Sequence, residues 1–295
     1  MRAVYNILKE DPVFSSIYDD IICHLVFMLS EKEMKHILDN IVPECDLILS
    51  QPVSSNYKGS DLFSTKTLRS RIKEGGKHLI LPNCYFTGYD PVPFQTTNDK
   101  HEIISSTTGI SYYPSLCLKS LLEGNVEQAC KDWCNINAYT DEEIKNNFEK
   151  SITELKQREQ KVFDNEYGVD VIISDYIENN YRSDFLFHTY NHPTNLLLVE
   201  LARRTMHKLG IPNINLGSKL TKELLGDVSI PPPLCLYYRQ EFNFEYPSFN
   251  LFGNKYTTIE VMKIFSDNLK EHSPKLHEQW LSCISYGRVK INNTN

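Results

Sequence analysis

The sequence lacks the signatures that most often identify an enzyme or a membrane protein. It has no apolar run approaching the roughly 20 residues of a membrane-spanning helix, so no span is expected. It has no Gly-x-Gly-x-x-Gly fingerprint, Walker A loop, Gly-x-Ser-x-Gly elbow, Gly-Asp-Ser esterase motif or His-Glu-x-x-His zinc motif. These absences argue against the common dinucleotide-binding proteins, P-loop NTPases, serine hydrolases and zinc proteases.

An excess of positive charge is lacking as well. The chain has 31 Lys and Arg against 38 Asp and Glu, which gives a formal net charge of −7. Proteins that bind nucleic acids usually present a basic face to the phosphate backbone, so we expect no nucleic-acid partner. A local basic pocket for one phosphorylated ligand remains compatible with this balance.

The eight cysteines form no Cys-x-x-Cys pair, which removes the commonest zinc and redox arrangements. Cys130 and Cys134 lie four residues apart without a His or Cys cluster nearby in sequence, so we predict no metal site. Most others lie in apolar stretches such as IICHLVFM and PPPLCLYY, which is typical of reduced core cysteines. The first residues, MRAVYNILKEDPVF, lack the pattern of a signal peptide, so we expect a cytoplasmic location.

Short apolar runs alternate with helical patterns in the first third of the chain. A capping box at Ser30 and Glu33 predicts the start of a helix. Strands that alternate with helices indicate parallel pairing through helical crossovers. The predicted strands are residues 21–28, 46–49 and 77–82, and the other predicted helices are 2–9 and 64–73, the latter ending at Gly75 and Gly76.

The remainder of the chain is mainly helical by its apolar spacing. Residues 114–165, with a second capping box at Thr140 and Glu143, are predicted to form a helical insertion or lid. The aromatic-rich residues 228–295 are predicted to wrap the domain. We therefore expect one α/β domain over residues 1–295, helix-rich, with a short parallel sheet and helical crossovers. The further predicted elements are a strand at 169–174 and helices at 193–209, ending at Gly210 and Pro212, and at 257–271.

Three polar stretches fall at the ends of predicted strands. They are SQPVSSNYKGSD (50–61), PNCYFTGYDP (82–91) and FHTYNHPT (187–194), and each is rich in hydrogen-bonding side chains. In an open α/β sheet, ligands bind outside the carboxyl ends of the strands. The convergence of these stretches therefore predicts a ligand site at that edge.

The third stretch places two histidines at the start of a predicted helix. Pro193 suits a first helical turn because it has no amide proton, which makes Asn191 or His192 the N-cap. In one interpretation His192 only packs or bonds a backbone carbonyl. In the other it faces the cleft, where helix N-terminal amides disfavour the charged imidazolium and leave a neutral general base. His188 is expected to be a buried histidine that supports the site.

Three candidate ligand contacts carry an amide or a positive charge. Gln51 and Lys58 either bind a carbonyl or phosphate oxygen or belong to an ordinary polar loop. Arg182 is the lone cation best placed for a phosphate near His192. Its alternative role is an ion pair with Asp184 or Glu178.

The second stretch is aromatic. Tyr85, Phe86 and Tyr89 surround Gly88, a residue that permits close approach of a ligand or a positive φ. The three rings form either a wall against an adenine or sugar ring or a part of the core.

Taken in order, these stretches resemble the WcbI-like family of polysaccharide and capsule biosynthesis proteins. The similarity covers about residues 2–270 and is strongest at 46–52, 88–91 and 191–194. It is carried by DLILSQPVSSNYKGSDLFST, HLILPNCYFTGYDP and FLFHTYNHPTNLLLVELARRTMHKLGI. The resemblance implies a protein that binds coenzyme A or acetyl-coenzyme A and O-acetylates a surface polysaccharide or its sugar precursor.

The resemblance also implies roles for single residues. His192 would take a proton from a sugar hydroxyl, and Asn191 would help to stabilise the oxyanion formed at the thioester carbonyl. The implied partner is a sugar or polysaccharide acceptor, whereas no oligomeric state is indicated. The implied cofactor-binding residues are Gln51, Lys58, Tyr89, Arg182, His188 and Thr194.

One feature departs from the family pattern. Members usually begin with a short strand that ends in Gly-Asn-Cys-Gln, whereas MRAVYNILKEDPVF resembles the helix that follows it, so we expect this motif to be missing. Three other functions stay open. They are a glycan esterase, a sulfate or nucleotide-sugar transferase, and a non-catalytic paralogue that binds coenzyme A or a nucleotide.

Overall fold

The computed structural model describes most of the chain as two compact units. Unit one comprises Met1–Tyr85, Ile152–Asn180 and Pro193–Leu225, and unit two comprises Phe86–Ser151, Tyr181–His192 and Gly226–Asn295. Compactness does not show whether either unit folds alone, so the single domain over residues 1–295 stays a prediction. The described residues are 2–90, 93–100, 102–160, 168–211, 220, 222–231, 234–244 and 249–282.

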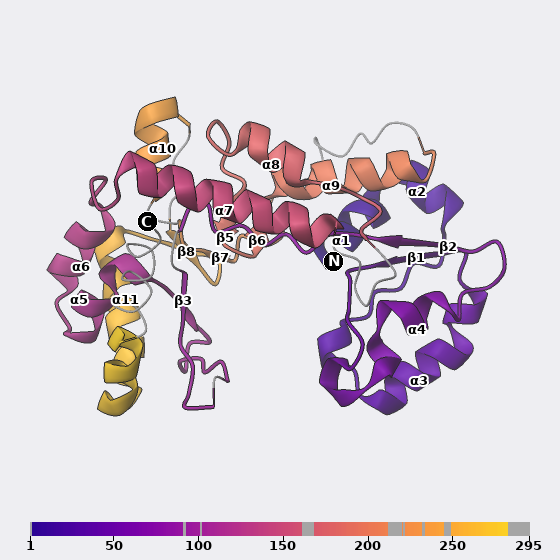
Figure 1. The fold of residues 1–295 in the computed structure, drawn as a ribbon, viewed down its shortest axis with the longest axis horizontal. Coiled ribbons are helices and arrows are strands. Elements are labelled where there is room, and N and C mark those ends of the chain that lie inside the picture. The colour runs from indigo at the N-terminus through magenta and orange to yellow at the C-terminus, as the bar shows by residue number, and fades with distance from the viewer. Residues whose placement is uncertain are drawn as a thin grey trace. The chain divides into compact units, whose positions relative to one another are not determined.

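Unit one is built on a parallel pair of strands, β1 (Leu47–Ser50) and β2 (Lys77–Ile80) (Figure 1). Parallel pairing of these two strands confirms the expectation from the sequence. Ile48 lies opposite His78, and Ser50 lies opposite Ile80. Since side chains alternate along a strand, all four point to one face of the pair.

Helices cover that face. α3 (Glu31–Asn40) begins with the predicted capping box, in which the Glu33 amide donates to the Ser30 hydroxyl and the Ser30 amide donates to the Glu33 carboxylate. The buried side of α3 packs with Phe63, and Ile48 of β1 packs against this cluster. α4 (Thr65–Arg69) ends earlier than predicted. The short 3-10 turns of this region are Val26–Met28, Val42–Glu44, Tyr57–Gly59 and Asp61–Phe63.

Two predicted strands of unit one are wrong. Residues 21–28 contain only the 3-10 turn Val26–Met28. Backbone carbonyls of this turn accept hydrogen bonds from the Lys58 side chain instead of from a neighbouring strand. Residues 169–174 make one strand-like contact, in which the Asp170 amide donates to the Ile80 carbonyl at 2.8 Å. The Asp170 carboxylate accepts a hydrogen bond from the Ile80 amide at 2.7 Å. This side-chain bond replaces the next backbone bond, so no strand pairing with β2 continues. The apolar side chains of residues 21–28 are half-buried or exposed, with Phe27 65% and Met28 70% exposed. In the second stretch Val171 and Ile173 are buried, but they do not continue the sheet.

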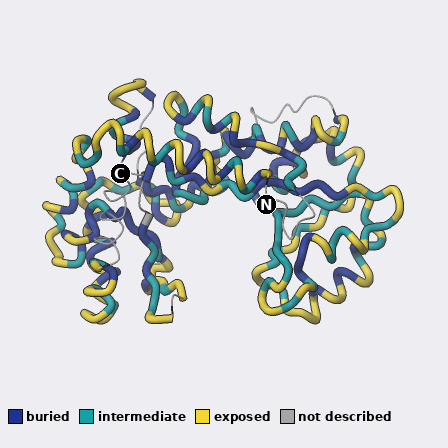
Figure 2. The backbone as a smooth tube through the Cα atoms, in the orientation of Figure 1, coloured by how far each residue is buried: buried dark blue, intermediate teal, exposed yellow. Residues whose placement is uncertain are grey.

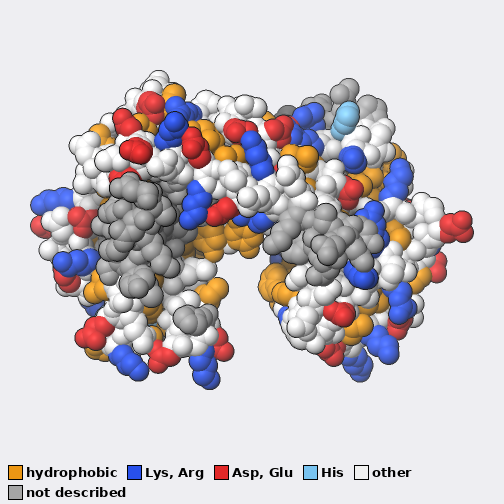
Figure 3. Space-filling model, viewed as in Figure 1, with side chains coloured by type: hydrophobic (Ala, Val, Ile, Leu, Met, Phe, Trp, Pro, Cys, Tyr) orange, Lys and Arg blue, Asp and Glu red, His pale blue; other side chains and the backbone are white. Residues whose placement is uncertain are grey.

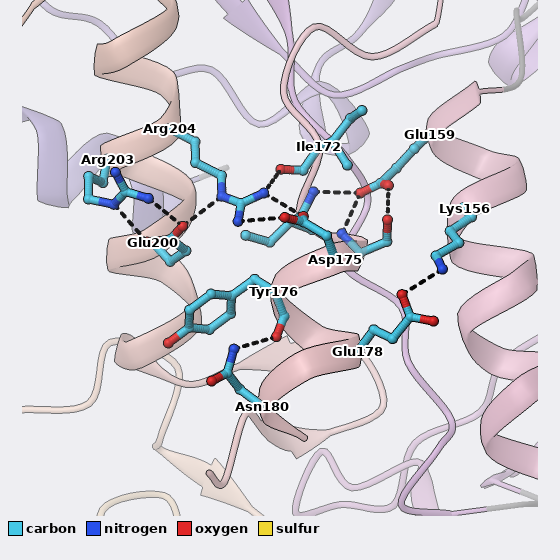
Figure 4. Close-up of polar contacts among 12 residues, drawn as sticks. Lys156, Glu159, Ile172, Asp175, Tyr176, Glu178, Asn180, Glu200, Arg203 and Arg204 are labelled. Carbon is cyan, nitrogen blue, oxygen red and sulfur yellow. Dashed lines mark hydrogen bonds and ion pairs between the residues drawn. The ribbon is translucent and has the colours of Figure 1, made fainter. Parts of the chain in front are cut away.

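A polar network holds three helices of unit one (Figure 4). The carboxylate of the buried Glu159, on the long helix α7 (Asp141–Gln160), accepts from the Ile173 and Ser174 amides at 2.8 and 3.0 Å. It thereby caps α8 (Ser174–Asn180). Arg204 on α9 (Asn195–Lys208) pairs with Asp175 of α8 and with Glu200 one turn earlier. The remaining helices are α1 (Arg2–Glu10), which packs on α9, and α2 (Pro12–Ile17), capped by Asp11.

Unit two has its core between three helices and two small antiparallel sheets. α5 (Leu118–Leu122), α6 (Val126–Trp133) and α11 (Thr258–Lys270) pack on one another and bury their apolar sides (Figure 2). The first half of α7 also belongs to this unit and begins at the predicted capping box, where the Glu143 amide donates to Thr140. The other elements are β3 (Pro93–Gln95), β4 (Tyr112–Pro114), the 3-10 turn Ser115–Cys117, β5 (Phe187–Thr189), β6 (His192–Pro193), β7 (Val228–Ser229), α10 (Leu234–Phe242), β8 (Phe249–Leu251) and β9 (Asn254–Tyr256).

The pairing of these strands is short and local. β3 pairs with β4, β5 with β6, and β7, β8 and β9 form one sheet. Together with the parallel pair of unit one, this gives the expected helix-rich α/β fold with short sheets. Several sequence expectations concern Pro91, Pro212, Cys283, part of the triple proline and the end of the insertion at 161–165, which lie outside the described residues.

The surface carries mixed charge. On the face shown in Figure 3, acidic and basic side chains are interspersed, and neither sign gathers into one large patch. Among the described residues, no helix has the length and apolar character needed to cross a membrane. The seven described cysteines are free thiols, and Cys117 and Cys235 are fully buried as a core role requires.

Candidate functional site

The predicted histidines of FHTYNHPT lie on β5 and β6 of unit two. His188, in the middle of β5, is buried, and its Nδ1 lies 2.9 Å from the Ser229 hydroxyl of β7. The His188 carbonyl also accepts from the Ile230 amide at 3.2 Å. These bonds join β5 to β7 and confirm that His188 is a buried strand histidine.

His192 is less enclosed than His188 but is held neutral. Burial lowers the pKa of His192, and the nearby His188 lowers it further. A hydrogen bond to the Val228 backbone acts in the opposite direction and is the smallest of the three effects. The neutral imidazole is therefore the stable form at physiological pH, which is the form that a general base requires.

The hydrogen bonds of His192 also assign its tautomer. Its Nδ1 is buried without a hydrogen-bond partner among the described residues. The bond to Val228 favours protonation and so places the ring as a donor through Nε2. The lone pair of the imidazole therefore lies on Nδ1. A buried acceptor without a partner is unfavourable by roughly 1–3 kcal/mol, so a hydroxyl group that donated to Nδ1 would stabilise the ring.

Asn191 lies directly beside this group. Its Oδ1 accepts from the Thr189 hydroxyl at 2.9 Å, which fixes the orientation of the side-chain amide. The two N–H groups of that amide are then the part that Asn191 can offer to a developing negative charge.

The helix that follows begins later than predicted. Thr194, rather than Asn191 or His192, is the N-cap of α9, and Pro193 precedes the helix instead of forming its first turn. The Asn195 amide donates to the Glu223 carboxylate at 2.8 Å. An anion already lies at this helix start, where the helix dipole favours it, so the position is unsuited to a phosphate. The buried Thr194 hydroxyl makes no capping hydrogen bond.

Lys58 of unit one is engaged by the backbone. Its ammonium group donates to the Phe27 carbonyl at 2.8 Å and to the Leu29 carbonyl at 3.0 Å. A third, longer contact of 3.4 Å reaches the Val26 carbonyl. These three acceptors hold the 3-10 turn that replaced the predicted strand at 21–28, and they account for the three protons of the ammonium group.

Tyr89 belongs to the core of unit two. Its hydroxyl lies 2.6 Å from the Tyr181 carbonyl, and burial raises its pKa well above the ordinary value. Its ring packs edge-on to Phe86 at 5.4 Å between centroids. A Cβ added at Gly88 would lie 2.1 Å from the Phe86 ring, so the glycine is required by close packing. Of the two interpretations of this stretch, the core is confirmed for Phe86 and Tyr89, whereas the Tyr85 side chain is 43% exposed.

Arg182 has a different partner from those expected. Its Nε donates to the Tyr181 hydroxyl at 2.7 Å, and its guanidinium lies 3.7 Å from the Glu241 carboxylate. Glu178 instead pairs with Lys156 at 2.6 Å. The Arg182 side chain is 47% exposed, so solvent screens its ion pair and a phosphate can still approach it.

A serine–histidine pair in unit one was not anticipated from the sequence. Ser50 Oγ lies 2.8 Å from His78 Nε2, across the parallel pair of strands. Burial, with a smaller contribution from Arg69, lowers the pKa of His78 to about 4 against the opposing effect of Asp170. The sequence signal was the polar residue in each strand at face-sharing positions. Gln51 follows on the same strand end and is half-buried, with its role as an amide donor still a prediction.

The structure thus groups the candidates by unit. Unit two holds His188, Asn191 and His192 in one short stretch, with Tyr89 and Arg182 in an aromatic cluster of the same unit. Unit one holds Gln51, Lys58 and Thr194. No group of three or more His, Cys, Asp or Glu residues in the described part of the chain is arranged to hold a metal ion.

Comparison with known proteins agrees with this fold. The family model described as polysaccharide biosynthesis enzyme WcbI matches residues 3–213. A solved structure of WcbI, described as a novel polysaccharide biosynthesis enzyme without a disulfide bond between coenzyme A and one of its cysteines, superposes with a TM-score of 0.82. The match has 23% sequence identity and covers 97% of this chain and 92% of that chain. No curated protein matches the chain.

Proposed function

Because the chain belongs to the WcbI family of polysaccharide biosynthesis enzymes, we propose that it is a coenzyme A-dependent O-acetyltransferase. Its acceptor would be a surface or capsular polysaccharide or a sugar precursor of one. The observation that carries the proposal is the His192 imidazole, neutral and with an unpartnered Nδ1. The solved WcbI structure, whose description names coenzyme A, supports the choice of donor.

The reaction needs a base and an oxyanion donor from this chain. His192 Nδ1 would accept the proton of the sugar hydroxyl as that oxygen forms an ester bond to the acetyl carbon. The carbon–sulfur bond of the donor breaks in the same transfer, and the proton passes from His192 to the departing sulfur. The Asn191 amide would donate to the carbonyl oxygen, a contribution of about 3 kcal/mol for one well-placed donor. His188, fixed by Ser229, would hold β5 against β7.

Only some of the predicted cofactor-binding residues are suited to contact acetyl-coenzyme A. Acetyl-coenzyme A would supply the activated acetyl group as a thioester, and the unpartnered His192 Nδ1 fits the hydroxyl that attacks it. Arg182 is the predicted cation that retains an exposed guanidinium for a phosphate. Lys58 and Tyr89 are engaged by backbone carbonyls, and the Thr194 helix start already holds a carboxylate. These three residues therefore have structural roles in the proposal.

The test is acetyl transfer measured on the full chain. The protein would be incubated with acetyl-coenzyme A labelled in the acetyl group and with de-O-acetylated capsular polysaccharide. We expect label in the polysaccharide and one free thiol released for each acetyl group transferred. Calorimetry with coenzyme A alone measures the binding step. Absence of both binding and transfer would overturn the proposal.

One observation favours a second candidate function, a glycan esterase. Ser50 and His78 lie within hydrogen-bond distance, as a nucleophile and its base do. Against this, His78 Nδ1 has no partner among the described residues, so the third group that would orient the base is lacking. Release of acetate from an acetylated glycan without coenzyme A, abolished by Ser50→Ala, would establish the esterase.

A further inference from the structure

A shallow hollow lies on the surface of unit two. Its lining residues are distant in the sequence from His188 and His192. Its volume is about 360 Å³, at the lower end of the range of roughly 300 to 1,000 Å³ that small-molecule sites occupy. Apart from Ile136, its lining consists of two phenols, two carboxylates and two amides. These residues are Asn137, Tyr139, Asp141, Tyr237, Gln240 and Glu241.

Two elements build this hollow. Tyr237, Gln240 and Glu241 lie three and four residues apart on α10, so they share one face of that helix. Asp141 is the first residue of α7, and the connection that leads into it supplies the other side. The Tyr237 hydroxyl donates to Asp141 Oδ1 at 3.2 Å, which links the two sides and limits the movement of the tyrosine ring.

The lining matches the chemistry of a sugar ring. Carboxylates accept hydrogen bonds from hydroxyl groups, whereas the side-chain amides of Asn137 and Gln240 can both donate and accept. Neither of these two amides has a hydrogen-bond partner within the described part of the chain. The half-buried rings of Tyr139 and Tyr237 add flat apolar surface with a polar edge, against which the C–H face of a pyranose can pack.

The charge of the hollow selects among sugars. Asp141 and Glu241 are both acidic, and no Lys or Arg is among the described residues that line the hollow. The Arg182 guanidinium lies 3.7 Å from Glu241 but outside this lining. A phosphate, sulfate or uronate group in the hollow would face like charge at short range. The lining therefore disfavours the nucleotide or phosphate portion of a donor and favours a neutral sugar.

We propose that this hollow binds a neutral pyranose of the acceptor polysaccharide. The proposal rests on the proposed acetyltransferase function and adds the place where unit two holds the acceptor chain. Binding of a single sugar in a shallow polar hollow is expected to be weak. Its selectivity for neutral over anionic sugars is the property that distinguishes it from a non-specific surface.

The experiment uses saturation-transfer NMR on the full chain with methyl glycosides as probes. Methyl α-D-glucopyranoside, methyl α-D-mannopyranoside and methyl β-D-galactopyranoside represent neutral sugars, and methyl β-D-glucuronide represents anionic ones. We expect transfer to the ring protons of at least one neutral glycoside and none to the glucuronide. Tyr237→Ala should lower that signal at least fivefold, while Arg239→Ala, exposed on the same helix, should leave it unchanged.

A charge variant tests the selectivity directly. Asp141→Asn combined with Glu241→Gln removes both carboxylates and should allow transfer to the glucuronide. The proposal is overturned if no neutral glycoside shows transfer, if Tyr237→Ala retains the full signal, or if the charge variant still excludes the glucuronide.

The two proposals fail separately. Acetyl transfer that depends on His192 but is unaffected by Tyr237→Ala would overturn the sugar hollow and leave the transferase in place. Glycoside binding that Tyr237→Ala abolishes, without any transfer from acetyl-coenzyme A, would leave the hollow in place and overturn the transferase.

Discussion

His78 in unit one and His192 in unit two share an uncommon feature, a buried ring nitrogen without a hydrogen-bond partner in the described part of the chain, but they lie in different surroundings. In both imidazoles Nδ1 is buried without a partner among the described residues, and burial lowers the pKa of both rings. His78 lies within a parallel pair of strands, where its Nε2 meets the Ser50 hydroxyl and helices cover its face. His192 lies on a two-residue strand directly before a helix, beside the amide of Asn191.

The two surroundings give the two imidazoles different roles. His78 is buried on a paired strand, and the Ser50 hydroxyl meets its ring, so its neutral form contributes mainly to folding. His192 is half-buried on a two-residue strand, its Nδ1 has no partner among the described residues, and Asn191 precedes it in the chain. We therefore expect changes at His78 to alter stability and changes at His192 to alter turnover.

The largest expected effect is on turnover at His192. His192→Ala should lower the rate of acetyl transfer on the order of 100-fold or more, because it removes the unpartnered Nδ1 that would take the proton of the sugar hydroxyl. The free energy of unfolding should change little in comparison. His207→Ala, an exposed histidine on α9, is the matched control and should keep full activity. Full transfer by the His192 variant would remove the base from the mechanism.

The next effect is the pH dependence contributed by His78. Burial lowers its pKa from 6.5 to about 4, so between these values the unfolded chain holds a proton that the folded chain does not. Stability is therefore full above about pH 6.5 and falls as the pH falls toward 4. The loss should reach about 3 kcal/mol, since one pKa unit corresponds to about 1.4 kcal/mol.

Urea unfolding at a series of pH values measures this slope. The difference in stability between the native protein and His78→Gln should narrow as the pH falls from 7 to 4, because the variant has no proton to gain at this position. Parallel pH curves for the two proteins would show that His78 does not titrate in this way.

A third effect concerns the carboxylate that begins α8. Glu159→Gln should lower the free energy of unfolding by roughly 2 kcal/mol. One carboxylate oxygen accepts from the Ile173 and Ser174 amides and the other from the Ser174 hydroxyl, and the substitution replaces one of these two oxygens with an NH2 group. Glu154→Gln, exposed on the same helix, provides the control. Thermal unfolding compares the two. An equal change in both variants would mean that Glu159 acts only through the charge of α7.

The smallest effects compare one capping box from each unit. Ser30→Ala and Thr257→Ala each remove the hydroxyl that accepts from the third residue of a helix, and each should destabilise the protein by about 1 kcal/mol. Lys35→Ala, an exposed substitution within α3, should change stability by a few tenths of that amount. A loss of less than about 0.3 kcal/mol from both caps would show that tertiary packing alone holds these helix starts.

Local patterns in the sequence predicted the elements whose determinants are close together along the chain. The capping boxes at Ser30, Thr140 and Glu143 lie where the structure has them, because the donor and acceptor are three residues apart. The parallel pairing of β1 with β2 also followed from alternating strands and helices. By contrast, residues 21–28 and 169–174 are as apolar as strands but do not form them. Lys58 binds backbone carbonyls of the first stretch, and Glu159 accepts from the Ile173 amide of the second.

The sequence by itself determined the family, the helix starts and the stretch in which His188, Asn191 and His192 lie, because each depends on residues that are near one another in the chain. Only the tertiary structure decided which polar side chains are already engaged. Lys58 meets carbonyls some thirty residues away, Tyr89 meets a carbonyl beyond residue 180, and Ser50 meets His78 across two strands. Partners so distant in sequence leave no local pattern, since only the folded chain brings their atoms within hydrogen-bond distance.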